Sequence, residues 1–77
     1  MTQEDLELFF EYNNLVEIQE DEGKIYLILD INNFKELYVL IGQYLIDNDI
    51  YLKPISENLF SIDITDILTF YEIRITQ

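Results

Sequence analysis

Residues 15–47 read LVEIQEDEGKIYLILDINNFKELYVLIGQYLID, and this stretch decides the fold. Residues 15–19 alternate between apolar and polar side chains, and residues 24–29 are apolar after Lys24 and rich in isoleucine and leucine. Both patterns are typical of β-strands. Between them, Glu20-Asp21-Glu22-Gly23 is a polar segment that ends in glycine, which favours a hairpin turn. The sequence therefore predicts a β-hairpin over residues 15–29.

A helix is predicted directly after this hairpin. Residues 30–33 have the turn and cap chemistry that precedes a helix. From residue 34 the apolar side chains recur at helical spacing on one broad face, and they are Phe34, Leu37, Tyr38, Ile41, Tyr44 and Leu45. The polar stripe is narrow and consists of Lys35, Glu36, Gln43 and Asp47. We therefore expect a largely buried helix that ends at residues 47–49.

The flanking segments complete an α+β pattern. Thr2, followed by acidic residues, predicts the start of a first helix that ends at Asn13-Asn14. Residues 50–55 and 59–64 predict a second hairpin, in which Pro54 belongs on an edge strand or at a strand end because it lacks an N–H. The last segment is ambiguous, since Thr65-Asp66 favours a helix start whereas residues 71–76 alternate like a strand.

An internal similarity bears on this last segment. With a shift of thirty-three residues, residues 30–34 match residues 63–67, which suggests a duplicated ββα unit with a shortened final helix. Chance similarity is the alternative, because few positions are identical. We expect a single α+β domain over residues 1–77, in the order αββαββα, with an antiparallel sheet and helices packed on one face.

The residue inventory argues against an enzyme. The chain has no histidine and no cysteine, and its two glycines are too few for a phosphate-binding loop. Asp30 and Asp63 are equivalent in the proposed repeat and would form an acid–base pair if they met, but helix capping is the favoured role for both. The acids between residues 17 and 22 lack calcium-loop spacing. We therefore expect no catalytic residues, no metal site and no cofactor.

Charge is the strongest functional feature. Sixteen acidic residues face four basic ones, so the net charge is −12, and residues 1–22 hold eight acids and no base. This charge disfavours direct contact with nucleic acid or membranes and favours a basic protein partner. The chain start lacks the pattern of a signal peptide, so we expect a cytoplasmic protein, in the host cytoplasm if a phage encodes it.

The predicted partner-binding residues are Glu4, Glu7, Glu11, Glu17, Glu20, Asp21 and Glu22. We expect the acidic stripe of the first helix to lie near the acidic hairpin tip. Its carboxylates would repeat every 5–6 Å or so, close to the spacing of nucleic-acid phosphates. The hypothesis is an inhibitor that occupies the cationic channel of a nucleic-acid-binding enzyme. Small acidic phage proteins, such as anti-CRISPR proteins and other DNA mimics, are similar in size and charge, although no motif is shared.

Two alternatives stay open. One is an immunity-type or antitoxin-type inhibitor, whose acidic face covers a basic toxin. The other is a regulatory or assembly subunit with a Tyr/Phe interface, in which acidity serves solubility. The six tyrosines cannot all be buried in so small a core, so some are expected at a binding surface or a homodimer contact. Solubility is also the simplest explanation of the charge.

Overall fold

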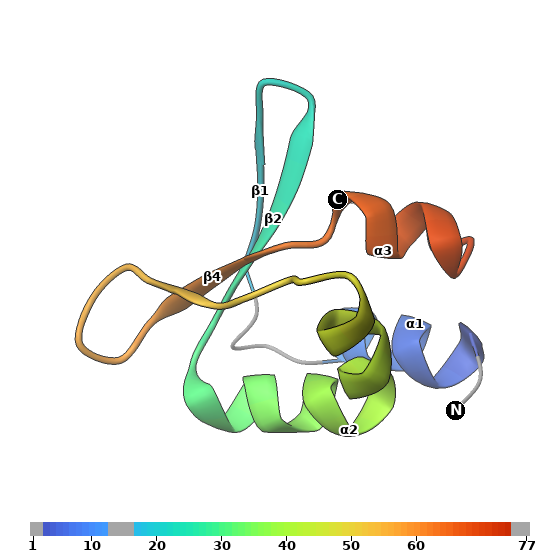
Figure 1. Ribbon diagram of the computed structural model, residues 1–77, viewed down its shortest axis with the longest axis horizontal. Coiled ribbons are helices and arrows are strands. Elements are labelled where there is room, and N and C mark those ends of the chain that lie inside the picture. The colour runs from blue at the N-terminus through green and yellow to red at the C-terminus, as the bar shows by residue number, and fades with distance from the viewer. Residues whose placement is uncertain (1–2, 13–16, 75–77) are drawn as a thin grey trace.

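The computed structural model of the protein describes residues 3–12 and 17–74 (Figure 1). Its elements, in chain order, are α1 (Gln3–Tyr12), β1 (Glu17–Asp21), β2 (Lys24–Leu29), α2 (Ile31–Asp47), β3 (Lys53–Pro54), β4 (Phe60–Asp63) and α3 (Thr65–Phe70). The predicted helix cap Thr2, the predicted helix end Asn13-Asn14 and the first strand residues Leu15 and Val16 lie outside the described residues.

The strands form one antiparallel sheet in the order β1-β2-β4-β3. Leu27 of β2 lies opposite Ile18 on one side and Ile62 on the other, so the two hairpins meet along their longer inner strands. Pro54 lies on β3, an edge strand, as its missing N–H predicts. The α+β class with an antiparallel sheet is confirmed.

The first hairpin turns more tightly than the sequence predicts. β1 continues through Asp21, and Glu22 and Gly23 alone connect the strands. Both have a positive φ, 50° at Glu22 and 81° at Gly23, which is the pattern of a type I′ turn. This turn is favoured in two-residue hairpins because its backbone twist matches that of the paired strands.

α2 begins three residues earlier than the apolar pattern predicts. Asp30 is its N-cap and accepts a hydrogen bond from the backbone N–H of Asn33 at 2.8 Å. At Ile41 the backbone leaves the helical region, with φ −133° and ψ 21°, and Figure 1 shows α2 changing direction. The expectation of a largely buried helix is wrong, since the side chains of Val39 and Ile46 are 83% and 55% exposed. Both residues lie on the solvent side of α2, together with Lys35 and Gln43 of the polar stripe.

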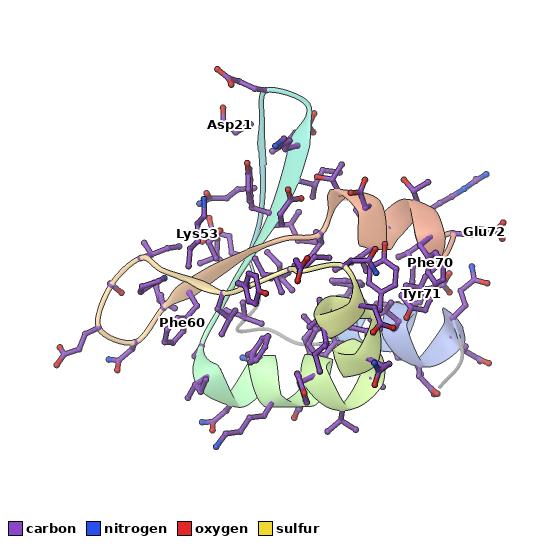
Figure 2. All side chains as sticks on the ribbon, viewed as in Figure 1. Asp21, Lys53, Phe60, Phe70, Tyr71 and Glu72 are labelled. Carbon is purple, nitrogen blue, oxygen red and sulfur yellow. The ribbon has the colours of Figure 1, made fainter. Side chains whose placement is uncertain are left out.

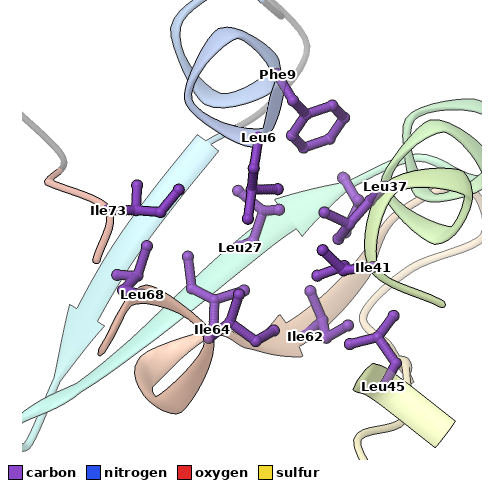
Figure 3. Close-up of a cluster of buried hydrophobic side chains, with 12 residues drawn as sticks. Leu6, Phe9, Leu27, Leu37, Ile41, Leu45, Ile62, Ile64, Leu68 and Ile73 are labelled. Atoms are coloured by element: carbon purple, nitrogen blue, oxygen red, sulfur yellow. The ribbon is translucent and has the colours of Figure 1, made fainter. Parts of the chain in front are cut away.

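The core lies between the sheet and the three helices. Figure 3 shows Leu27 and Ile62 of the strands meeting Leu6 of α1, Leu37 of α2 and Leu68 of α3. Because all three helices contribute to one cluster on the inward side of β2 and β4, the prediction that the helices pack on one face is confirmed. None of the helices in residues 3–12 and 17–74 is long and apolar enough to cross a membrane.

The last described element is a helix. α3 ends at Phe70, residues 71–74 carry no strand, and the rest of the alternative strand, from residue 75, lies outside the described part. The N-cap of α3 is Ile64, so the predicted cap at Thr65-Asp66 is wrong. The Thr65 hydroxyl instead accepts the Ile25 N–H at 2.9 Å and donates to the Asp63 carboxylate at 2.7 Å. Thr65 therefore joins α3 to β2.

Candidate functional site

The β1–β2 hairpin carries four of the seven predicted partner-binding residues. Glu17, Glu20 and Asp21 lie on β1 and Glu22 lies in the turn, and all four side chains are exposed. Because side chains alternate along a strand, Glu17 and Asp21 lie on one face of the hairpin and Glu20 on the other. Figure 2 shows Asp21 at the tip, where the hairpin stands out from the body of the protein. The carboxylates therefore lie on both faces and in the turn of a projecting hairpin.

The other three predicted residues lie on α1. Glu4, Glu7 and Glu11 are exposed, whereas Leu6 and Phe9 bury the opposite side of the helix in the core. This division follows directly from helical periodicity. The first turn of α1 is held to the C-terminal segment by Gln3, whose side-chain amide donates to the backbone oxygen of Glu72 at 2.7 Å. The α1 acids thus form an outer stripe.

The structure does not bring the two acidic groups together. Figure 1 shows the tip of the β1–β2 hairpin pointing away from α1 and α2. The expected proximity of the first helix and the hairpin tip is therefore wrong. The physical reason is that α1 packs against the core through Leu6 and Phe9, whereas the hairpin extends beyond the core. We define the two groups as the hairpin acids (Glu17, Glu20, Asp21 and Glu22) and the α1 acids (Glu4, Glu7 and Glu11).

A polar depression on the open face of the sheet was not predicted. It has a volume of about 400 Å³, and Lys24, Lys53, Tyr26, Tyr51 and Asp66 are among the residues that line it. It gathers two of the chain's four basic residues, which are far apart in sequence. Lys24 and Tyr26 belong to the outward side of β2, and this alternation is the one sequence pattern that points to it.

Nearby hydrogen bonds occupy two carboxylates of this depression. The Tyr51 hydroxyl donates to Asp49 at 3.1 Å, and that hydrogen bond, followed by the negative charge of Asp49, raises the pKa of Tyr51 above its ordinary value. Asp63 accepts from the backbone N–H of Thr65 at 2.9 Å as well as from its hydroxyl. With two lysines and three aspartates, the depression carries no large excess of either charge.

Asp30 and Asp63 do not form an acid–base pair. Asp63 lies opposite Tyr26 in the β2–β4 ladder, whereas Asp30 follows the other end of β2. Four residues of strand separate the two levels by roughly 13 Å. Asp30 has the predicted capping role, and Asp63 bonds the first residue of α3. Across residues 3–12 and 17–74, no three acidic side chains are grouped so as to hold a metal ion.

Apolar and aromatic surfaces lie elsewhere on the helices. Between α1 and α2, Leu8, Phe9, Val39 and Leu40 line an apolar groove of about 610 Å³, with Asp5 and Glu36 beside them. Val39 was not singled out by the sequence analysis, although it is an apolar residue on the polar stripe of α2, between Lys35 and Gln43, and that position is the signal that could have found it.

An aromatic cluster joins the second half of α2 to α3. The ring centroids of Tyr44 and Phe70 are 4.7 Å apart, and those of Phe70 and Tyr71 are 4.9 Å apart. Figure 2 shows Phe70 and Tyr71 side by side at the end of α3, where Phe70 is 63% exposed. Burial, with a smaller effect of Tyr44, raises the pKa of Tyr71 above its ordinary value of 10.0.

The five tyrosines whose side chains are described lie at the surface or are half-buried, and the side chain of Tyr12 lies outside the description. This confirms that they do not all fit inside the core. In comparisons with known proteins, the chain matched no family model, no curated protein and no solved structure.

Proposed function

We propose that this protein is a non-enzymatic inhibitor whose acidic hairpin occupies a cationic groove on a nucleic-acid-binding protein. The observation that carries the proposal is the projecting β1–β2 hairpin with its four exposed carboxylates. A narrow projection enters a groove that a flat acidic face cannot enter. Because the groove normally holds phosphates, binding by carboxylates would displace its counterions as nucleic acid does. Occupation of the groove would then exclude the nucleic acid.

The partner class follows from charge. The chain carries −12, so like-charged nucleic acid and anionic lipid are repelled, and basic protein surfaces are attracted from a distance. A nucleic-acid enzyme is the preferred partner, in the manner of anti-CRISPR proteins and other DNA mimics. An immunity-type inhibitor of a basic toxin would use the same contacts. The two differ in whether added duplex DNA competes for the partner.

The test compares three sets of charge-neutral substitutions. The hairpin set is Glu17→Gln, Glu20→Gln and Asp21→Asn. The α1 set is Glu4→Gln, Glu7→Gln and Glu11→Gln. The control set, which removes the same charge from exposed positions elsewhere, is Glu36→Gln, Asp47→Asn and Glu57→Gln. Each protein is immobilised and offered a bacterial lysate at about 50 mM salt, then eluted with duplex DNA or with about 200 mM salt.

The proposal expects a basic protein that is released by salt and by DNA. The hairpin set should weaken its binding at least about tenfold, which corresponds to about 1.4 kcal/mol. The control set should change it by less than about threefold, since exposed single charges contribute little. Equal losses in all three sets would mean that total charge, not the hairpin, is responsible. Loss in the α1 set alone would assign the interface to α1.

A second candidate function is an assembly subunit, and the cluster of Tyr44, Phe70 and Tyr71 supports it. Phe70 is 63% exposed although its ring contacts the Tyr44 ring at a tilt and the Tyr71 ring edge to face. Aromatic side chains are enriched at protein interfaces. Binding through this cluster would be insensitive to salt and would fail in Phe70→Ser. Salt-resistant capture that the hairpin set leaves unchanged would favour this candidate.

A further inference from the structure

The outer edge of β1 presents backbone groups to solvent. β1 is the end strand of the sheet, with β2 as its neighbour in the order β1-β2-β4-β3. In an antiparallel ladder, the residues of one strand direct their N–H and C=O groups alternately toward the two sides. Asp21 and Lys24 close the two-residue hairpin, so their backbone groups form hydrogen bonds with each other. By the same alternation, the backbone groups of Gln19 pair with those of Tyr26, and those of Glu17 pair with those of Ile28.

The backbone N–H and C=O groups of Ile18 and Glu20 consequently face outward, away from β2. Their cross-strand neighbours, Leu27 and Ile25, face the opposite way, toward β4. The hydrogen bonds of Ile25 confirm this direction, because its C=O accepts from the Ile64 N–H at 2.9 Å and its N–H donates to Thr65 at 2.9 Å. Along the free edge of β1, Ile18 and Glu20 thus offer two N–H donors and two C=O acceptors in strand geometry.

The opposite edge of the sheet is unsuited to accept a strand. β3 is two residues long, Lys53 and Pro54, and proline has no N–H to donate. Short, proline-containing edges are a common protection against strand addition. β1 is five residues long and has no proline. Within the described sheet, β1 is the edge that can template a further strand.

The side chains of β1 select the charge of that strand. Glu17, Gln19 and Asp21 lie on one face of the edge, and Ile18 and Glu20 lie on the other. A second copy of the chain, paired antiparallel about Gln19, would set Glu17 against Asp21 and place Glu20 beside another acidic strand. Like charges directly opposite destabilise a strand pair. A strand with Lys or Arg opposite Glu17 and Asp21 has the complementary pattern.

We propose that β1 binds an extended, basic segment of the partner protein as a fifth strand of the sheet. This rests on the proposed function, because it specifies how the hairpin acids meet the cationic partner. Two alternate residues of the partner would exchange hydrogen bonds with Ile18 and Glu20, while the basic residues that flank these two lie beside Glu17 and Asp21. Backbone hydrogen bonds supply affinity in strand addition, and side chains at alternate positions supply specificity.

The test uses a synthetic heptapeptide in which Lys and Val alternate. Strand N–H groups also alternate in direction, so in the charge-matched register the Val amides face β1 and the Lys amides face solvent. Two isomers are compared with the unmodified peptide, one N-methylated on its Val residues and one on its Lys residues. The isomers have the same charge and nearly the same size. They differ in which edge of the peptide strand keeps its N–H groups and can form hydrogen bonds with β1. Binding to the full chain is measured by calorimetry at about 50 mM salt.

The proposal expects the peptide methylated on Lys to bind within about threefold of the unmodified peptide. The peptide methylated on Val should bind at least about tenfold more weakly. In hydrogen exchange, the unmodified peptide should protect the amides of Ile18 and Glu20, which face solvent in the free protein. The double variant Glu17→Gln, Asp21→Asn should lower affinity without moving this protection.

Equal binding of the two isomers, without protection of Ile18 and Glu20, would overturn strand addition and leave a purely electrostatic contact of the hairpin. Absence of binding by all three peptides would overturn strand addition as well. The capture experiment tests the proposed function separately. That function fails if no captured protein is released by DNA and by salt.

Discussion

At the scale of single residues, the least favourable backbone positions are occupied by charged side chains. Glu22, Asp49 and Glu72 have φ values of 50°, 53° and 54°, in the left-handed region. Asp tolerates this region through local hydrogen bonds, whereas the longer Glu lacks that compensation. Glu22 therefore costs stability at a turn that Asn-Gly would form more readily. An acidic side chain at the hairpin tip is what the proposed binding role would require.

We predict that Glu22→Asn raises the free energy of unfolding by about 0.5–1 kcal/mol. Asn accepts the left-handed backbone of the first turn position more readily than Glu. Urea unfolding of the two proteins would measure the difference. Glu57→Asn is the matched control, since it removes the same charge from the second hairpin, where the backbone has no positive φ. An equal gain in the control would attribute the effect to charge.

A second residue-scale prediction concerns Tyr71, whose pKa is raised by burial and by Tyr44. The folded protein holds the Tyr71 proton more tightly than the unfolded chain. The contribution of the protonated Tyr71 to the free energy of unfolding is therefore complete below pH 10, and it is lost as the pH rises through the raised pKa of Tyr71. Urea midpoints measured from pH 8 to pH 11 should fall more steeply for the natural protein than for Tyr71→Phe. Parallel curves would contradict a raised pKa.

At the scale of elements, the short helix α3 depends on its attachment to the sheet. It has six residues, and isolated helices of this length are unstable in water. Ile67 and Leu68 bury its inner face, and Thr65 ties its first turn to Ile25 of β2. The Thr65 hydroxyl also bonds Asp63, so one side chain joins a strand end, a helix start and the neighbouring strand.

We predict that Thr65→Val lowers the free energy of unfolding by about 1–3 kcal/mol, because it leaves the Ile25 N–H without its partner. Val matches Thr in shape, so packing is preserved. Thr69→Val is the control, since its hydroxyl makes a longer, exposed bond of 3.4 Å to the Thr65 carbonyl. Thermal or urea unfolding should separate the two variants. Similar effects would mean that side-chain shape or helix propensity dominates.

At the scale of the whole molecule, the net charge opposes folding. A charge of −12 is compressed into a body with a radius of gyration of 11.5 Å, so carboxylates repel one another across the surface. Compactness intensifies such repulsion, and dissolved salt screens it. The separation of the hairpin acids from the α1 acids reduces the repulsion that a single patch would create.

We predict that the free energy of unfolding rises as NaCl increases from about 10 to 150 mM, a range in which the Debye length falls from about 30 to 8 Å. Urea unfolding at each concentration would measure the rise. MgCl₂ at the same ionic strength is the control for a specific cation site. An unchanged or falling stability in NaCl would contradict the repulsion.

The sequence by itself determined the elements of this protein. Periodicity located the strand at residues 24–29 and the cap at Asp30, because alternation and capping are properties of neighbouring residues. It also determined that α1 has an acidic side. Four features were predicted wrongly or missed: the depth at which α2 is buried, the cap of α3, the depression containing Lys24 and Lys53, and the distance between the first helix and the hairpin tip.

Only the tertiary structure decided where the acids point and which strand edge is free. The order β1-β2-β4-β3 makes β1 an edge, and the packing of α1 against the core places that helix away from the hairpin tip. These outcomes depend on contacts between residues distant in sequence. Local patterns specify the face of each element, whereas the relative placement of the faces arises from the way all elements share one core.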